Sequence, residues 1–267
     1  MEQPKNNLKI VAGKNNARML LPNILTLIGV CIGLTSIRFA LSGEFHLAII
    51  AIIFAALIDG LDGRIARLIK GTSKVGKELD SLTDMISFGV APAFIMYFWK
   101  LNTLGRFGWL LCLVYVICVA LRLARFNVNS NQEPSWRDNF FEGVPSPAGG
   151  ILVLTPLILS LSGFNYVQLN YEIITPIFFI ITSFLLISKF PSYSFKKIVI
   201  QRKATIFLLF GIILFFGLLL IYTFEMISIS SIIYLFLLPI SYFHYQKLKK
   251  NNENDKNQED EDLEDVL

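Results

Sequence analysis

The sequence predicts an all-α protein: a polytopic integral membrane bundle of about eight transmembrane helices with both termini in the cytoplasm. Three observations lead to this prediction: an apolar composition, a series of long apolar runs, and an asymmetric distribution of Lys and Arg. Of the 267 residues, 54% are hydrophobic and only 16% are charged, and the mean hydropathy is +0.58. These values lie outside the averages of soluble domains, so the chain belongs in a membrane.

The apolar runs define the expected spans, because a transmembrane helix needs about 20 predominantly apolar residues. Eight runs meet this requirement approximately, at 20–42, 45–66, 78–98, 107–125, 147–163, 172–189, 204–223 and 228–246. They divide the chain into an N-terminal cytoplasmic segment (1–18), a transmembrane domain (19–246) and a charged cytoplasmic tail (247–267). The tail has too few apolar residues to offset the entropy of ordering, so we expect it to be disordered.

The orientation follows from the basic residues. With the N-terminus in the cytoplasm, 21 of the 24 Lys and Arg residues fall on that side, and only Arg38, Lys100 and Arg106 fall on the other. This bias indicates an even number of spans with both ends in the cytoplasm. Without residues 251–267 the chain has 23 basic and 12 acidic residues. We interpret this charge as favouring an anionic membrane surface rather than nucleic acid, because no soluble basic domain remains.

Four aspartates stand out within residues 59–84: Asp59, Asp62, Asp80 and Asp84. Spacings of three and four residues place each pair on one face of its helix. If the second and third spans are antiparallel neighbours, the turn through 70–74 brings both pairs to the same depth at the cytoplasmic edge. The sequence therefore predicts that the four carboxylates converge.

Convergent carboxylates need a compensating cation, because like charges repel strongly where water is partly excluded. A cluster of oxygen ligands without nearby His or Cys suits Mg²⁺ or Mn²⁺ better than zinc. Hard cations held by carboxylates commonly serve phosphate chemistry. The simpler alternative is that each aspartate faces water near a span end, but acids clustered within membrane segments favour a functional site.

The same stretch resembles the complete signature of the CDP-alcohol phosphatidyltransferase family, D-x-x-D-G-x-x-A-R-x(8)-G-x-x-x-D-x-x-x-D. Every fixed position is met, at Asp59, Asp62, Gly63, Ala66, Arg67, Gly76, Asp80 and Asp84. Residues 22–26 (PNILT) are also similar to a segment near the nucleotide diphosphate in these enzymes.

Further stretches resemble the bacterial phosphatidylserine synthase branch of the family, the CDP-diacylglycerol–serine O-phosphatidyltransferases. These are 121–127 (LRLARFN), 141–150 (FEGVPSPAGG), and 80–84 (DSLTD) leading into 87–92 (SFGVAP). The resemblance implies transfer of a phosphatidyl group from CDP-diacylglycerol to the hydroxyl of L-serine, giving phosphatidylserine and CMP. It also implies a homodimer in contact with membrane lipids, in the bacterial inner membrane, and the predicted orientation of the spans places the active site on the cytoplasmic side.

The resemblance also implies the roles of the site residues. Asp59, Asp62, Asp80 and Asp84 would hold Mg²⁺ or Mn²⁺, as two ions, and Asp84 would also be the general base. The expected CDP-diacylglycerol contacts are Asn23, Thr26, Gly63, Ala66, Arg67, Ser73 and Gly76. Arg122 and Arg125 either bind the serine carboxylate or a substrate phosphate, to which guanidinium is well suited, or serve as basic anchors at a span end.

Two alternatives remain open. In the first alternative, the reaction is the same but the acceptor is glycerol 3-phosphate or inositol phosphate instead of serine, and Arg122 and Arg125 bind its phosphate. In the second alternative, which belongs to a different functional class, the protein is a divalent-cation or proton-coupled transporter. Its carboxylates would then line a pathway near the bilayer centre. The placement of the aspartates at one edge, and the lack of a visible inverted repeat, favour the enzyme.

Overall fold

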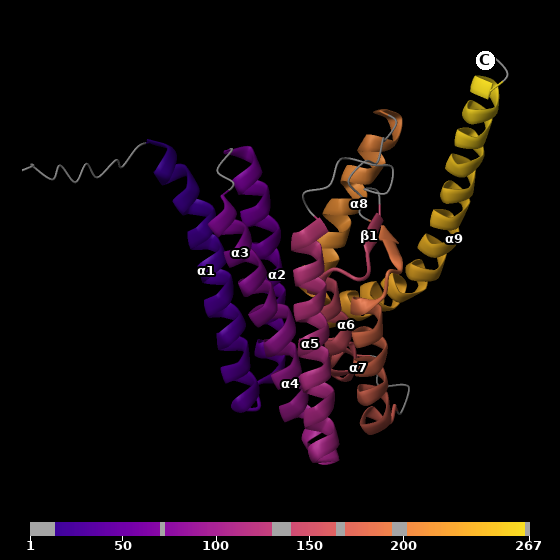
Figure 1. Ribbon diagram of the computed structural model, residues 1–267. Helices are drawn as coiled ribbons and strands as arrows, with labels where there is room; N and C mark the ends of the chain where they lie inside the picture. The colour runs from indigo at the N-terminus through magenta and orange to yellow at the C-terminus, as the bar shows by residue number, and fades with distance from the viewer. Residues whose placement is uncertain (1–13, 70–72, 130–139, 164–168, 194–201, 265–267) are drawn as a thin grey trace, which may run out of the picture.

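The computed structural model describes residues 14–69, 73–129, 140–163, 169–193 and 202–264 (Figure 1). In chain order, the described elements are α1 (Lys14–Leu41), α2 (Phe45–Leu68), α3 (Lys74–Asp84), the π-helical turn η1 (Met85–Val90), α4 (Ala91–Trp99), the 3₁₀ turn η2 (Leu101–Leu104), α5 (Arg106–Asn129), β1 (Phe140–Glu142), α6 (Ser146–Leu161), α7 (Tyr171–Ile187), β2 (Pro191–Tyr193), α8 (Arg202–Ile221) and α9 (Thr223–Glu264).

The all-α membrane bundle that the sequence predicts is confirmed. Within the described residues, five helical segments are long and apolar enough to cross a membrane: Leu21–Leu41, Phe45–Leu68, Val75–Trp99, Arg106–Val128 and Thr223–Lys250. Three shorter apolar helices follow the remaining predicted runs: Ser146–Leu161, Tyr171–Ile187 and Thr205–Ile221. The chain is therefore a multi-pass membrane protein.

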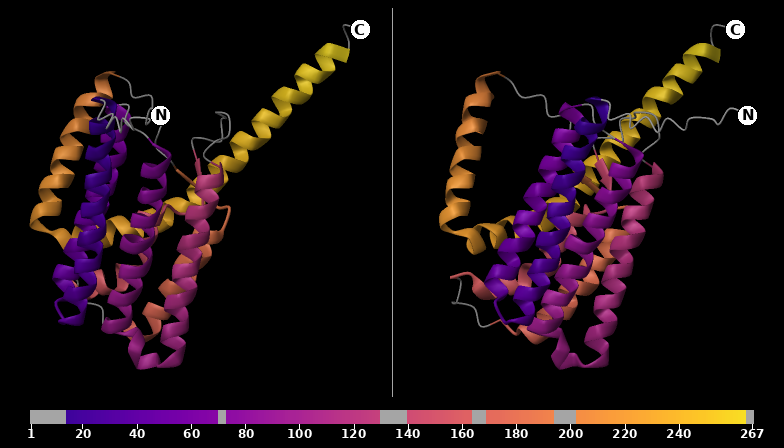
Figure 2. Two further views of the ribbon diagram at one scale, coloured as in Figure 1. Left: turned by 60° about the vertical axis from the view of Figure 1, so that its left-hand side comes forward. Right: turned by 90° about the vertical axis from the view of Figure 1, so that its left-hand side faces the viewer.

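The helices pack as a bundle in which α1 lies along α2 and also contacts α3 and α4. Helix α5 packs on α7, and α6 packs on both α7 and α9. The start of α1, the end of α2, the start of α3 and the end of α9 all lie at the same end of the bundle (Figures 1 and 2). Helix α8 stands at the edge and contacts α9, and its exposed apolar side chains suit contact with lipid.

Residues 75–99 form one apolar segment that is interrupted by the π-helical turn η1. Pro92 explains this interruption, because proline has no N–H and its ring clashes with the carbonyl of the residue four positions earlier, Phe88. The hydroxyl of the fully buried Tyr115 donates to that carbonyl oxygen at 2.7 Å. A side chain of α5 thus satisfies a backbone group that the turn leaves available. The turn begins directly after Asp84, so it also sets where that aspartate lies.

Glycines let two helices approach η1 closely. A Cβ on Gly33 of α1 would lie 3.1 Å from the Ser87 Cα, and one on Gly150 of α6 would lie 3.2 Å from the Phe88 Cβ. A Cβ on Gly33 would also lie 2.5 Å from Ser87 Oγ, so Ser87 would have to shift, and a Cβ on Gly150 would require Phe88 to move by a few tenths of an ångström. Helices α1 and α6 thereby close on the segment that follows Asp84.

Replacing Tyr115 by Phe is expected to destabilise the fold without changing its shape, because the Phe88 carbonyl then loses its hydroxyl donor inside the core. A buried acceptor left unsatisfied costs about 1–3 kcal/mol, and we expect a lower thermal unfolding midpoint in detergent. The exposed Tyr222, replaced by Phe, is the matched control and should leave the midpoint unchanged. Equal midpoints for the Tyr115 variant and the wild type would contradict this account of η1.

A short two-stranded sheet joins segments that are distant in the sequence. Strand β1 pairs antiparallel with β2, with Phe140 opposite Tyr193 and Glu142 opposite Pro191. Three-residue strands are shorter than the alternating patterns by which strands are recognised in a sequence, and the sequence predicts neither of them. The pairing ties the segment before α6 to the segment after α7.

Helix α9 continues as helical backbone to Glu264, whereas the composition predicts disorder from residue 247. Lys, Glu and Gln have favourable helix propensities, and a preformed apolar helix removes the cost of nucleation for the residues that follow it. The described backbone after residue 247 is therefore helical and not disordered as expected. The division of the chain into segments 1–18, 19–246 and 247–267 stays a prediction.

Candidate active site

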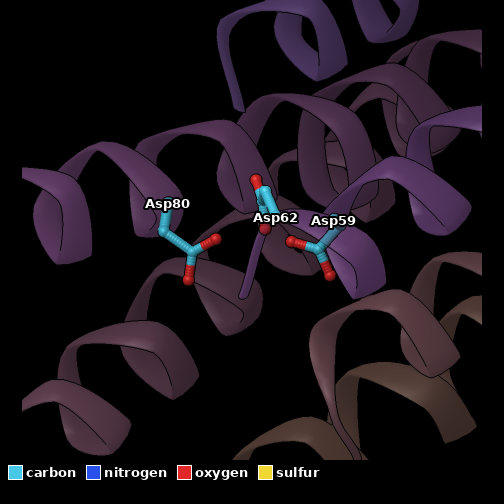
Figure 3. A group of neighbouring side chains, drawn as sticks. All are labelled: Asp59, Asp62 and Asp80. Carbon is cyan, nitrogen blue, oxygen red and sulfur yellow. The ribbon is translucent and has the colours of Figure 1, made fainter. Parts of the chain in front are cut away.

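Three of the predicted carboxylates come together at one end of the bundle. Asp59 and Asp62 lie on α2 and Asp80 on α3, and one ligand oxygen from each lies within 4.8 Å of the others. Figure 3 shows the three side chains turned toward a common space. Asp62 is buried and the other two are half-buried. The predicted convergence is confirmed for these three carboxylates.

Asp62 is held by a side chain of α1. Thr26 Oγ1 donates to Asp62 Oδ2 at 2.6 Å and lies 3.0 Å from the carbonyl oxygen of Pro22. A hydrogen bond of this kind fixes the orientation of a carboxylate, as it does for metal ligands in general. The resemblance associates Thr26 with the nucleotide diphosphate, and the structure connects it to a carboxylate of the cluster.

Asp84 lies next to the cluster, at the end of α3, and is only 8% exposed. It interacts electrostatically with Asp59, Asp62 and Arg122. Its Oδ2 accepts a hydrogen bond from the Ser146 hydroxyl at 2.6 Å. Ser146 of α6 therefore holds this aspartate by a hydrogen bond, and Arg122 of α5 acts on it through its charge.

The charge balance of these residues fits a divalent cation. Two like unit charges 4 Å apart repel by about 4 kcal/mol at an effective dielectric constant of about 20. Within the described part of the chain, Arg122 is the basic side chain whose charge acts on Asp84 and Asp59, which leaves the group negative. Oxygen ligands on opposite sides of Mg²⁺ lie roughly 4 Å apart, twice the metal–oxygen distance. Oxygens within 4.8 Å of one another are close to that spacing, so the donor set fits Mg²⁺ or Mn²⁺.

The predicted nucleotide contacts on α2 include a glycine beside open space. Gly63, Ala66 and Arg67 are spaced so that they share one face of the helix, and a Cβ on Gly63 would meet no described atom within 4 Å. Arg67 is exposed. The backbone at Gly63 is thus accessible to a ligand beside the carboxylates.

The other predicted nucleotide contacts gather where α1 meets the start of α3. Ser73 is the N-cap of α3, and its hydroxyl oxygen accepts from the Gly76 N–H at 2.9 Å. A Cβ on Gly76 would lie 2.9 Å from the Asn23 Oδ1. Gly76 therefore leaves room for Asn23, and the three residues form one small polar group.

Replacing Gly76 by Ala is expected to displace the Asn23 side chain, because no real Cβ tolerates an oxygen at 2.9 Å. If Asn23 and Ser73 contact the nucleotide, the Michaelis constant for the nucleotide substrate rises by roughly 10-fold, the value of one lost hydrogen bond. Gly211 on α8 has open space around it, and its replacement by Ala is the control that should leave the constant unchanged. An unchanged constant in the Gly76 variant would remove this group from the substrate site.

The two predicted arginines differ in their surroundings. Arg122 is 8% exposed, donates from Nη1 to the Ser146 hydroxyl oxygen at 2.9 Å, and lies over the Phe126 ring. Arg125 donates from Nη2 to the Ile187 carbonyl oxygen at 2.6 Å, at the C-terminal end of α7. Arg122 thus belongs to the surroundings of Asp84 and Arg125 caps a helix, while acceptor binding by either stays a prediction.

Ser146 is the site residue to which the sequence analysis assigns no role. It falls within the stretch 141–150, but a serine between two prolines at a helix start carries no sign of its partner. Asp84 is 62 positions away in the chain, and the contact arises only because α6 packs against η1. The sequence feature that could have indicated a role for Ser146 is the resemblance of residues 141–150 to the family, but this resemblance does not distinguish one residue of the stretch from another.

With this fold and site, the chain belongs to the CDP-alcohol phosphatidyltransferase family, whose sequence model matches residues 19–187. Among named relatives, a CDP-diacylglycerol–serine O-phosphatidyltransferase of Mycobacterium leprae is 46% identical over 144 residues, which are 53% of this chain and 48% of that protein. One of Helicobacter pylori is 35% identical over 220 residues, 82% of this chain and 90% of that protein. One of Bacillus subtilis is 34% identical over 158 residues, 56% of this chain and 86% of that protein. The chain thus spans about half the length of its mycobacterial relative.

Proposed function

We propose that this protein is an enzyme that transfers the phosphatidyl group of CDP-diacylglycerol to the hydroxyl of L-serine, giving phosphatidylserine and CMP. The observation that carries the proposal is the convergence of Asp59, Asp62 and Asp80 beside a buried Asp84. The family membership supports the reaction class, and the names of the relatives from three bacterial genera support serine as the acceptor. The product is a membrane phospholipid, so the pathway is phospholipid biosynthesis.

Asp59, Asp62 and Asp80 would hold the divalent cations, with Asp84 as a further ligand, and we propose two ions of Mg²⁺ or Mn²⁺. When bound, such cations neutralise the diphosphate and stabilise the charge of the departing CMP. Thr26 keeps the Asp62 carboxylate in place for this purpose. The all-oxygen donor set at one end of the bundle supports this assignment.

Asp84 would take the proton of the acceptor hydroxyl as its oxygen attacks the phosphorus of the phosphatidyl group. An alcohol is a weak nucleophile at neutral pH, and a carboxylate within reach of its proton increases the rate. The new oxygen–phosphorus bond forms as the bond between that phosphorus and the CMP oxygen breaks. The burial of Asp84 beside the carboxylate group supports this role.

The cytidine diphosphate would lie along the open face of α2 at Gly63, Ala66 and Arg67, and reach Asn23, Thr26, Ser73 and Gly76. The open space at Gly63 supports this placement. We propose that Arg122 and Arg125 act on the acceptor side, where the burial of Arg122 near Asp84 supports its part. The acyl chains would remain in the lipid beside the bundle.

We further propose that the active site faces the cytoplasm and that the protein is a homodimer in the bacterial inner membrane. The orientation is supported by the 21 of 24 basic residues assigned to the side of the N-terminus. The dimer is supported by the family resemblance alone.

The test is a product assay with purified protein in detergent, Mg²⁺ or Mn²⁺, CDP-diacylglycerol and one alcohol at a time, followed by mass spectrometry. Phosphatidylserine and CMP should form with L-serine, and a mixture without an alcohol is the control. Turnover only with glycerol 3-phosphate or inositol phosphate would reject serine as the acceptor. Failure with every alcohol, combined with divalent-cation uptake into sealed proteoliposomes, would replace the enzyme by a transporter.

A further inference from the structure

Ser146 connects Arg122 to Asp84 through two hydrogen bonds in series. Arg122 Nη1 donates to Ser146 Oγ at 2.9 Å, and Ser146 Oγ donates to Asp84 Oδ2 at 2.6 Å. Guanidinium has donors only and a serine hydroxyl has a single proton. Because an ionised carboxylate can only accept, the hydroxyl proton goes to Asp84. The direction of both hydrogen bonds is therefore fixed by the chemistry of the three groups.

The backbone around Ser146 is fixed as firmly as its hydroxyl. Gly143 has a φ of 78°, and a Cβ there would lie 2.8 Å from the Ser188 carbonyl oxygen, so the close approach requires glycine. Its N–H donates to the Phe190 carbonyl oxygen at 2.9 Å, and its carbonyl oxygen accepts from Ser192 Oγ at 2.9 Å. These bonds continue the β1–β2 pairing to within three residues of Ser146.

Two prolines and complete burial restrict what movement is left. Pro145 and Pro147 flank Ser146, and the proline ring fixes φ at each position. Ser146 itself is 0% exposed, at the first residue of α6. Its hydroxyl thus belongs to a rigid segment anchored on α7 and β2, and not to a mobile loop.

The two carboxylate oxygens of Asp84 therefore differ in their hydrogen bonding. Oδ2 accepts the Ser146 proton, whereas Oδ1 is buried and receives no hydrogen bond from an N–H or hydroxyl group within the described residues; the Asp84 carboxyl group also interacts closely with that of Asp59. A buried carboxylate oxygen without a donor is costly. Oδ1 is therefore the oxygen left for the cation to which Asp84 is proposed as a further ligand and for the hydroxyl of the acceptor, and the bond at Oδ2 determines where it lies.

We infer that Ser146 is a positioning residue, which holds the Asp84 carboxylate so that Oδ1 faces the acceptor hydroxyl, and that Arg122 acts on the reaction through it. This inference rests on the proposed function only in taking Asp84 as the general base. It applies to any alcohol, because each acceptor must lose its hydroxyl proton in the same way.

The test is a double-mutant cycle on the turnover number with Ser146→Ala and Asp84→Asn. Ser146→Ala should lower the turnover number by about 10- to 100-fold, the factor for one hydrogen bond to a charged group. The Michaelis constant for CDP-diacylglycerol should change less than about twofold, because Ser146 contacts Asp84 and Arg122 and not the residues proposed to bind the nucleotide. In the Asp84→Asn background the same substitution should have no further effect, since residues that act as a unit are not additive.

Two further variants separate positioning from folding. Ser146→Thr keeps the hydroxyl and should restore part of the turnover that Ser146→Ala loses. Ser36 is equally buried and donates within its own helix, to the Gly33 carbonyl oxygen at 2.6 Å, so Ser36→Ala controls for losing a buried hydroxyl and should keep wild-type turnover. Additive effects of Ser146→Ala and Asp84→Asn, or a loss confined to the Michaelis constants, would overturn the inference.

The outcome is distinguishable from failure of the proposed function. If the wild type transfers to glycerol 3-phosphate or inositol phosphate but not to serine, the proposed acceptor is rejected, and the cycle is measured with the active alcohol. If Asp84→Asn alone keeps full turnover, Asp84 is not the base, and the inference about Ser146 is overturned with it. A wild type that is inert with every alcohol overturns both.

Discussion

Replacement of Asp84 by Asn is expected to lower the rate of phosphatidyl transfer by about 10²- to 10⁴-fold, the usual contribution of a positioned general base. Asparagine has nearly the same shape, and its amide oxygen accepts the Ser146 proton as Oδ2 does in the wild type. The buried site should therefore remain packed, while the amide takes no proton from the acceptor. The measurement is the initial rate of CMP release from CDP-diacylglycerol in detergent.

The control for this variant is Glu172→Gln. It also exchanges a carboxylate for an amide, but on α7, where Glu172 lies 3.7 Å from Lys100 and is exposed. Its rate should equal that of the wild type, and both variants should keep the wild-type thermal midpoint. Near-normal turnover by Asp84→Asn would reject the base assignment. If Asp84→Asn has a much lower thermal unfolding midpoint than the wild type, the second variant to measure is Asp84→Ser. This variant removes the base and the buried charge together, and it should also be inactive.

Removal of divalent cations is expected to abolish transfer, and added Mg²⁺ or Mn²⁺ should restore it. Within the described residues, Arg122 acts on Asp59, and one basic group does not balance the charge of the three carboxylates Asp59, Asp62 and Asp80, so a bound cation is needed. The measurement is the transfer rate after exhaustive chelation and during titration with each metal. Full activity of the chelated protein would exclude the metal role.

A variant of the cluster sharpens this prediction. Asp80→Asn should raise the metal concentration for half-maximal rate by at least about 10-fold, since even a residue that only supports a metal ligand usually contributes 10- to 100-fold to affinity. An unchanged metal requirement in this variant, with full rate, would place the cation elsewhere.

Most of the helical architecture was predictable because it depends on local composition. A run of about 20 apolar residues identifies a span wherever the chain then packs, and the described apolar helices follow the eight predicted runs. The η1 turn was not predictable in detail. Pro92 marks a disturbance four residues upstream, but the turn is completed by Tyr115 on α5, 27 positions away from Phe88.

The carboxylate cluster was predictable for a different reason. The spacings of Asp59 to Asp62 and of Asp80 to Asp84 set a helix face directly, and a short connection between the spans sets their common depth. The hydrogen bonds that hold these carboxylates were not predictable. Thr26 reaches Asp62 from helix α1, and Ser146 reaches Asp84 from helix α6. Such contacts depend on how helices pack, which neither periodicity nor spacing encodes.

The central claim, that Asp59, Asp62 and Asp80 together hold a divalent cation, is tested most directly by Mn²⁺ binding. Electron paramagnetic resonance of free Mn²⁺, titrated into purified protein with CDP-diacylglycerol present, measures this without relying on turnover. Saturable binding should occur in the wild type and in Glu172→Gln, and should be lost when Asp59 and Asp80 are both replaced by Asn. Equal binding by that double variant, or no binding by the wild type, would contradict the claim.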